Sequence, residues 1–332
     1  WLKVRGYVFS AAAQAEIPGL LGERADEAKT LLLQDVTVIG SSEVVATVPA
    51  EAGLVETVLA PGPSGIFIAT SLSERELFIS DPDGRWINAP IRNGSDLSGI
   101  VTDPARDIGW VASANIDGSE EKEQSFIGLI GLTGDINDLK YVPAPEGVAL
   151  SDLALGPDGT VYASDPLGGG IYFASPGAER LEALLEPGTL RSPQGLAVSE
   201  DGQRLYVSDY RYGIAMVDLA SRKVTRLAAD VPALLDGIDG LWRHGNELIA
   251  VQNGTSPIRI SAFALSGDGT RVSGHRVLEQ ANPDWTEPLG GSIAGDALFY
   301  VGNGQWDRFE KGQPVAGKPA LPTQIRKLPL TR

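Results

Sequence analysis

The chain has 332 residues, which is enough for one large single-core fold or for two ordinary domains. Its formal net charge of −16 repels phosphate backbones and argues against nucleic-acid binding. It contains no cysteine, which excludes disulfides and thiolate chemistry, and its two histidines exclude a zinc site built on several imidazoles.

The first 50 residues differ in pattern from the rest of the chain and predict a short helical extension. The segment GLLGERADEAKTLLLQ, residues 19–34, has helical spacing, and Pro18 just upstream is a helix-start signal. The preceding VFSAAAQA, residues 8–15, has two interpretations: an ordinary N-terminal helix, or the tail of a signal peptide with small residues at Ala13 and Ala15. We expect a periplasmic or secreted protein, with a cytoplasmic one as the alternative. No run approaches the ~20 apolar residues of a transmembrane segment.

Residues 51–332 repeat one unit six times. Each unit has a short apolar strand, a turn, and a second strand rich in β-branched and aromatic residues, such as RLYVS at 204–208. Asp158-Gly159 and Asp201-Gly202 supply the positive φ that a tight hairpin demands. The units start at Ser64, Ser98, Ser151, Gln194, Asp239 and Gly290. These intervals are close to the ~40–50 residues of a four-stranded propeller blade.

The repeat predicts an all-β fold, a six-bladed β-propeller with the N-terminal helical extension. The sixth unit runs out of chain after its third strand, QIRKLPL, residues 324–330. The segment LVETVL, residues 54–59, has no unit of its own. We expect it to lie beside the C-terminal strand 324–330 as the missing outer strand, because ring closure removes exposed strand edges.

A propeller gathers its first-strand starts and its second-to-third loops at one mouth of the central channel, which is the default ligand site. The first-strand starts predict a polar ring of ligand-binding residues at Ser64, Ser98, Ser151, Gln194 and Asp239. For Asp239 the alternative is an aspartate that only bonds backbone amides.

Loops at the same mouth supply further candidates. Asn253 and Asn303 each precede a glycine that lets the loop come close to a ligand. The longest loop, residues 302–323, carries Trp306 and Arg308, an aromatic and cationic pair that could cap a ligand. Packing of Trp306 on the rim is the alternative.

Catalysis by a Ser-His-Asp triad is excluded, because no histidine is expected at this mouth. His244 falls in a first-to-second turn at the opposite end, and His275 falls on an outer strand. A carboxylate pair of Asp239 with Glu287 stays open.

Two stretches, SPQGLAVSEDGQRLYVSDYRYGIAMVDL at 192–219 and DGIDGLWRHGNELIAVQNG at 236–254, resemble the gluconolactonase and regucalcin-like (senescence-marker-protein type) six-bladed propellers, which also look like NHL-type repeats. The resemblance covers about Leu54 to Arg332. It implies a divalent cation in the channel, often calcium, held by a first-blade Glu, a blade-four Asn and a later Asp. In that family the cation polarises a lactone carbonyl and the Asp helps to activate water.

Matched position by position, the chain departs from this pattern. Asp239 keeps the Asp, but Gln194 replaces the blade-four Asn and Ser64 stands where the first-blade Glu is expected. Ser151 replaces a third-blade Asn that contacts substrate, and Asp152 should point to the other side of its strand if Ser151 faces the channel. One carboxylate and one amide make a weak calcium cage.

The missing carboxylate favours a non-catalytic binding or scaffold protein that takes a small polar molecule or a protein partner at the channel mouth. The alternative is a lactonase-type hydrolase with Asp239 as its catalytic residue. In that case Asp239 and Gln194 are the expected ligands of a divalent cation.

Overall fold

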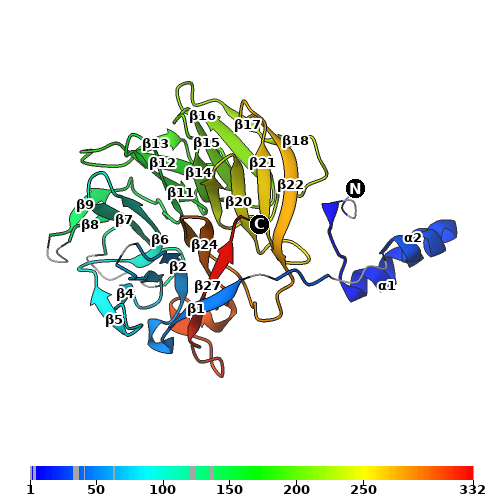
Figure 1. The fold of residues 1–332 in the computed structure, drawn as a ribbon, viewed down its shortest axis with the longest axis horizontal. Helices are drawn as coiled ribbons and strands as arrows, with labels where there is room; N and C mark the ends of the chain where they lie inside the picture. The colour runs from blue at the N-terminus through cyan, green and yellow to red at the C-terminus, as the bar shows by residue number, and fades with distance from the viewer. Residues whose placement is uncertain are drawn as a thin grey trace.

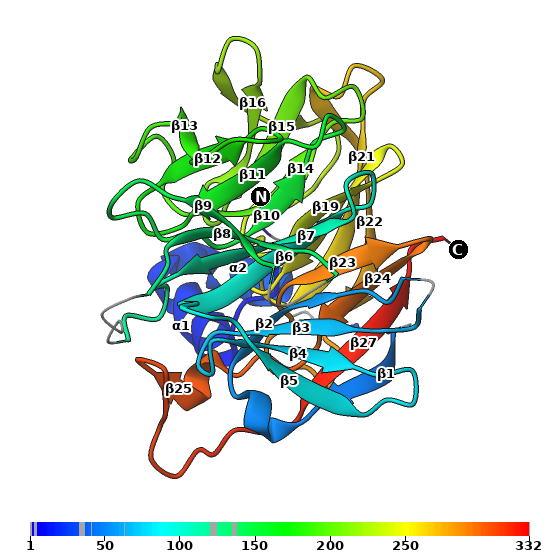
Figure 2. The ribbon, with the colours of Figure 1, turned by 90° about the vertical axis from the view of Figure 1, so that its left-hand side faces the viewer.

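The structure is a computed structural model that describes residues 2, 5–32, 37–40, 42–62, 64–119, 125–134 and 138–331. Six sheets of four or five strands stand in a ring, with their innermost strands toward the middle (Figures 1 and 2). The predicted six-bladed β-propeller is therefore confirmed.

The blades follow one another along the chain, each running from its inner strand to its outer strand. Blade one is β2 (Val55–Leu59), β3 (Ile68–Ser71), β4 (Glu76–Ser80) and β5 (Trp86–Pro90). Blade two is β6 (Asp96–Asp103), β7 (Ile108–Ala114), β8 (Gly128–Leu132) and β9 (Lys140–Pro143). Blade three is β10 (Leu153–Leu155), β11 (Val161–Asp165), β12 (Gly170–Ala174) and β13 (Glu182–Leu185).

The second half of the ring has the same plan. Blade four is β14 (Pro193–Val198), β15 (Arg204–Asp209), β16 (Gly213–Asp218) and β17 (Val224–Arg226). Blade five is β19 (Leu241–His244), β20 (Glu247–Gln252), β21 (Arg259–Leu265) and β22 (Arg271–Gln280), edged by β18 (Ala228–Ala229). Blade six is β23 (Gly291–Ala294), β24 (Ala297–Val301), β27 (Thr323–Pro329) and β1 (Glu43–Val48). A small hairpin, β25 (Phe309–Glu310) with β26 (Gln313–Pro314), lies in the long loop before β27.

The ring is closed by β1, so the prediction that residues 54–59 lie beside the strand 324–330 is wrong. β1 pairs antiparallel with β27, from Glu43 opposite Lys327 to Val48 opposite Thr323. A short 3₁₀ turn, Ala50–Ala52, leads directly from β1 into β2, the inner strand of blade one. Residues 54–59 therefore belong to blade one, and the stretch around Ser64 is the β2–β3 connection and not a strand start.

Neighbouring blades pack face to face through apolar side chains. Between blades three and four, Ile171 and Leu184 meet Leu196, Leu205 and Val217, all of them buried. Similar clusters join the other blades, so the core is distributed around the ring.

Near the channel, three backbone hydrogen bonds link adjacent blades in pairs. The amides of Gly99, Gly195 and Gly290 donate to the carbonyl oxygens of Ser151, Asp239 and Glu56 at 2.9, 2.7 and 3.1 Å. A Cβ on Gly195 would lie 2.7 Å from the Asp239 carbonyl oxygen and would also overlap the backbone of Leu241. Glycine after Gln194 is thus required by the close approach of blade five.

We predict that Gly195→Ala lowers the free energy of unfolding by about 2 kcal/mol, because the added methyl group has backbone on two sides and no space to relax. Gly267→Ala is the matched control, since a Cβ there meets nothing within 4 Å. Urea denaturation of both variants measures the difference. Equal stability of the two variants would contradict this account of the blade junction.

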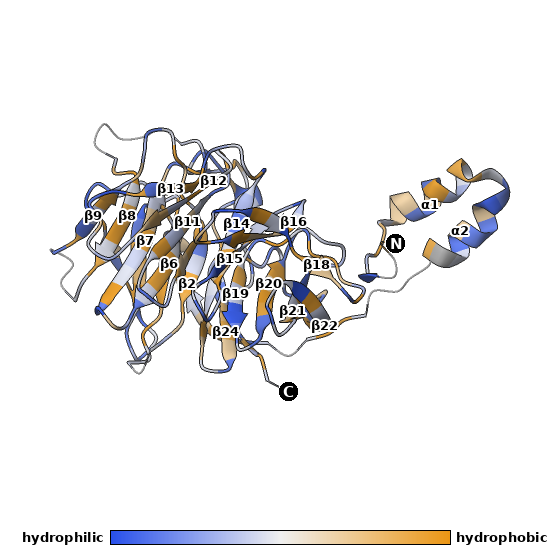
Figure 3. Ribbon diagram, turned by 90° about the horizontal axis from the view of Figure 1, so that it is seen from above, coloured by the Kyte–Doolittle hydropathy of each residue, from blue (hydrophilic) through white to orange (hydrophobic). Residues whose placement is uncertain are grey.

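The N-terminal extension is a helical hairpin that stands away from the ring (Figures 1 and 3). It comprises α1 (Ala11–Leu20), a 3₁₀ turn (Gly22–Arg24) and α2 (Ala25–Leu32). The predicted helical extension is confirmed, but Pro18 lies inside α1 and does not start a helix. The start is set by Ser10, whose Oγ accepts a hydrogen bond from the Ala13 amide at 3.2 Å. Within the described residues, no helix has the length and apolar character to cross a membrane.

A buried arginine anchors the segment before this hairpin to blade five. Arg259 is 1% exposed, and its guanidinium donates to the carbonyl oxygens of Gly6 at 2.6 Å and Arg5 at 3.3 Å. On the far side of the hairpin, Ile39 pairs with Gln280 at the end of β22.

Candidate functional site

The candidate site is a cavity of about 270 Å³ at the mouth where the inner strands start. Inner-strand starts provide its floor, and second-to-third loops provide its walls, which is the arrangement the propeller geometry predicts. The residues that matter below are Glu56, Ser151, Gln194 and Asp239 from the strand starts and Leu72, Ile116, Leu167, Tyr210, Asn253, Glu287, Leu289 and Trp306 from the loops and adjoining turns.

Five of the predicted ligand-binding residues come together in this cavity. Ser151, Gln194 and Asp239 line it from blades three, four and five. Asn253 reaches it from the β20–β21 loop, and Trp306 reaches it from the long loop of blade six. Their roles in binding remain predictions.

The other four predicted ligand-binding residues are not among those that line the cavity. Ser64 is exposed in the β2–β3 connection. Ser98 is fully buried, and its Oγ donates to the Ser151 carbonyl oxygen at 3.0 Å, so it joins blade two to blade three.

Asn303 and Arg308 stabilise the long loop itself. The Asn303 side chain donates to the Pro322 carbonyl oxygen at 3.0 Å and accepts from the Gln324 amide at 2.6 Å. The Arg308 guanidinium donates to the Pro319 carbonyl oxygen at 3.1 Å.

Glu56 is the site residue that the sequence-based prediction missed. It lies in β2, lines the cavity, and its Oε2 accepts a hydrogen bond from Trp306 Nε1 at 3.0 Å. The repeat pattern predicts an outer strand at residues 54–59, where a side chain would lie far from the channel. The sequence VETV, residues 55–58, does contain an indication of the site. Burying a charged side chain such as Glu56 among apolar residues is costly, so its presence there indicates a binding or catalytic role.

Asp239 is held by a side-chain relay and not by backbone amides. Asn253 Nδ2 donates to Asp239 Oδ2 at 3.1 Å and to the Pro288 carbonyl oxygen at 3.3 Å. The Tyr210 hydroxyl donates to Asn253 Oδ1 at 2.9 Å and so fixes which way the amide points. The alternative in which Asp239 only bonds backbone amides is therefore not what the structure shows.

Carboxylates crowd this part of the channel. Burial, with repulsion from Asp239 and Asp152, raises the pKa of Glu56 well above its usual range. Burial, with the charges of Asp152 and Glu287, raises the pKa of Asp239 to about 8. Among the described residues that line the cavity there is no Lys, Arg or His to offset these charges.

Asp152 also faces the channel, so the expectation that it points away is wrong. It lines a small cavity of about 20 Å³ together with Thr57 and Trp242, while Ser151 lines the larger cavity at the mouth. Regular pairing in β10 begins only at Leu153, so strict alternation does not apply to the two preceding residues. Burial raises the pKa of Asp152 to about 7.

The donor atoms at the mouth are the hard oxygens that Ca²⁺ and Mg²⁺ prefer. They come from the carboxylates of Glu56 and Asp239 and from the amide oxygen of Gln194. The Gln194 Nε2 donates a hydrogen bond to Ser192 Oγ at 3.2 Å. Across the described ranges, no three acidic, histidine or cysteine side chains are grouped closely enough to hold a metal ion. A cation here would therefore need amide or backbone oxygens beside the two carboxylates.

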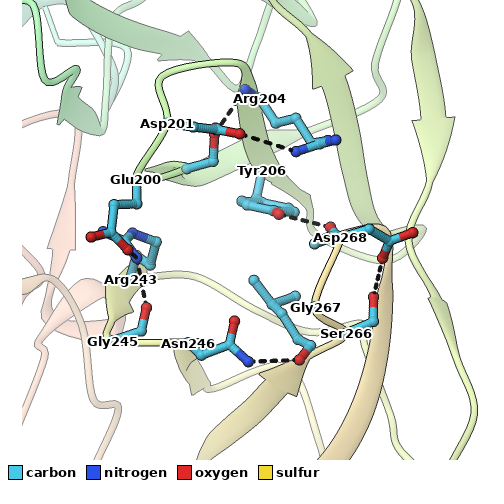
Figure 4. Close-up of a pocket in the computed structure, with 13 residues that line it drawn as sticks. Glu200, Asp201, Arg204, Tyr206, Arg243, Gly245, Asn246, Ser266, Gly267 and Asp268 are labelled. Carbon is cyan, nitrogen blue, oxygen red and sulfur yellow. Dashed lines mark hydrogen bonds and ion pairs between the residues drawn. The ribbon is translucent and has the colours of Figure 1, made fainter.

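A second cavity, of about 450 Å³, lies among turns at the opposite ends of blades four and five (Figure 4). Its polar groups are largely used within those turns. Ser199 and Ser266 donate to Asp201 and Asp268 at 2.5 and 2.6 Å, and the Tyr206 hydroxyl donates to the Gly269 carbonyl oxygen at 2.7 Å. The cavity at the channel mouth is therefore the stronger candidate.

Comparison with known proteins supports the fold. No family model matches the chain, and no curated protein matches it. A solved virginiamycin B lyase from Staphylococcus aureus has a TM-score of 0.59 at 13% identity, covering 88% of this chain and 100% of the lyase. A gluconolactonase from Xanthomonas campestris has a TM-score of 0.56 at 14% identity, covering 90% and 99%.

A luciferin-regenerating enzyme has a TM-score of 0.56 at 12% identity, covering 87% of this chain and 95% of that one. At these identities the comparisons concern the fold alone, and the three proteins have different activities by name. The chain has the six-bladed propeller fold of the gluconolactonase and regucalcin-like proteins.

Proposed function

We propose that this protein is a divalent-cation-dependent hydrolase of small lactones or esters, acting at the cavity at the channel mouth. The observation that carries the proposal is Glu56, which lies in the same cavity as Asp239. The preference for a non-catalytic binding protein depended on the absence of a first-blade carboxylate. Glu56 removes that reason.

The hydrogen bonds of the cavity support a role for a cation. Three of the side-chain donors are used internally: Trp306 on Glu56, Tyr210 on Asn253, and Asn253 on Asp239. Hydrolysis of a lactone needs stabilisation of the negative charge that develops on the carbonyl oxygen. A cation bound by Glu56, Asp239 and Gln194 would supply it as a Lewis acid.

Asp239 is the best candidate for the general base. Without a cation, burial with neighbouring carboxylates raises the pKa of Asp239 to about 8, and a cation bound beside it would lower this pKa. A base is most effective when its pKa lies near the working pH. Asn253 is a positioning residue, because its amide is oriented by Tyr210 and fixes Asp239 Oδ2.

Thermal melting with added Ca²⁺, Mg²⁺ or Mn²⁺, together with a panel of lactones and esters, tests the proposal. We expect one of these cations to raise the melting temperature, because a ligand at 100 times its Kd stabilises the native state by about 2.7 kcal/mol. Asp239→Asn should abolish the shift. If no cation changes the melting temperature and no compound is hydrolysed, the proposal is wrong.

A further inference from the structure

The cavity at the channel mouth has two chemically different sides, and we infer from them that its substrate is uncharged and carries an apolar substituent. The claim that such a molecule is hydrolysed rests on the proposed function, whereas the claim that it binds in the cavity does not. We call Leu72, Ile116, Leu167, Leu289 and Trp306 the apolar wall.

The apolar wall is continuous over the first, second and sixth blades. Leu72, Ile116 and Trp306 belong to one packed cluster, and Leu289 packs with Trp306 in the next. Leu167 extends the wall from the β11–β12 loop of blade three and is 68% exposed. Leu72 and Leu289 are 0% and 1% exposed and only support the wall from behind, so the surface open to a substrate comes from Ile116, Leu167 and Trp306. Covering this surface with an apolar group gains about 25 cal/mol per Å² removed from water.

The polar side offers few free donors to a polyhydroxylated ring. Recognition of several hydroxyl groups requires free donors as well as acceptors. The donors of Tyr210, Asn253 and Trp306 are already bonded within the site. Gln194 Nε2 donates to Ser192 Oγ and keeps one free N–H, and the hydroxyls of Ser151 and Ser192 can also donate, so the free donors lie only on the side of blades three and four. A sugar-like lactone would therefore find donors for only part of its hydroxyl oxygens, and each oxygen left without a partner is costly.

The cavity has no cationic side chain that would bind an anionic substituent. Glu56, Asp239 and Glu287 line the cavity, and none of its described lining residues is cationic. A carboxylate or phosphate on the substrate would find no arginine or lysine to pair with, which disfavours binding. A neutral alkyl or aryl group against the apolar wall fits both sides of the cavity.

The test compares two lactones with the same six-membered ring, δ-decalactone with its pentyl group and δ-gluconolactone with its hydroxyl groups. We expect kcat/KM for δ-decalactone to be about tenfold higher or more, in line with the gain from burying a short alkyl chain. Leu167→Asn should reduce this preference about threefold or more by removing part of the wall. Leu20→Asn, on α1 and 83% exposed, is the matched control and should leave it unchanged.

The outcomes separate this inference from the proposed function. Hydrolysis with a preference for δ-gluconolactone overturns the inference and leaves the proposed function standing. If neither of these lactones nor any other compound of the panel is hydrolysed, the proposed function fails, and binding decides the inference. In that case, displacement of the uncharged dye prodan by δ-decalactone but not by δ-gluconolactone supports it, and failure of δ-decalactone to displace the dye overturns it.

Discussion

Glu56→Gln is expected to lower kcat/KM for lactone hydrolysis by about 10²–10³-fold, the usual effect of removing one electrostatic group from an active site. Gln keeps the size of the side chain and an oxygen that accepts from Trp306 Nε1, so the fold should persist. What the variant loses is one of the two carboxylates proposed to hold the cation. The cation-induced rise in melting temperature should fall with the activity.

Ser64→Ala is the matched control for this variant. Ser64 was the residue expected at the first-blade position, and it lies exposed in the β2–β3 connection. Its replacement should change neither hydrolysis nor the cation-induced shift. If Glu56→Gln were as active as Ser64→Ala, the assignment of Glu56 to the site would be wrong.

Most of the fold could be predicted from the sequence, because each hairpin carries its own turn chemistry. The Asp158-Gly159 and Asp201-Gly202 turns do adopt positive φ at their glycines and join β10 to β11 and β14 to β15. Six such units at blade-like intervals leave little choice of architecture.

The strand order predicted for blade one is shifted by one strand, because the sequence of a single blade does not determine which of its strands lies innermost. The GPSG around Ser64 resembles the SPQG at Gln194, and the strands after it are apolar enough to look like inner ones. In the structure Ile68–Ser71 and Glu76–Ser80 are the second and third strands, and Trp86–Pro90 is the outer one. The inner position of β2 depends on β1 pairing with β27, residues nearly 280 positions away.

The same limit applies to the candidate site. Gln194 and Asp239 could be placed from the repeat alone, because each starts an inner strand beside a glycine. The contacts of Asn253 with Asp239 and of Trp306 with Glu56 connect different loops and blades, and no local pattern encodes them. Ser98 and Asn303 are polar residues of the kind expected in a binding site, but their side chains form hydrogen bonds with the backbone of Ser151 and Gln324.

Without divalent cations, the stability of the protein should contain a component that falls as the pH rises from about 4 to about 8. The pKa of Asp239 is raised from 3.8 to about 8 and that of Asp152 to about 7. Between these limits the folded state binds more protons than the unfolded state, so the free energy of unfolding decreases with pH. The contribution is complete below about pH 4 and is lost as the pH rises through the folded-state pKa values.

Surface carboxylates such as Asp268 and Asp218 have lowered pKa values, so their contribution to the free energy of unfolding rises with pH. Comparing Asp239→Asn with wild type removes this contribution, because both proteins contain the same surface carboxylates. One pKa unit corresponds to at most about 1.4 kcal/mol, and screening by solvent in the channel leaves a difference on the order of 2 kcal/mol at pH 8. Melting in EDTA should therefore show Asp239→Asn gaining stability over wild type as the pH rises, while Asp83→Asn, at an exposed turn, follows wild type. Because a bound cation would stabilise the ionised carboxylates, its addition should cancel this gain. Parallel pH profiles for Asp239→Asn and wild type would mean that the pKa of Asp239 is not raised in the folded state, which removes the reason for choosing it as a base with a pKa near the working pH.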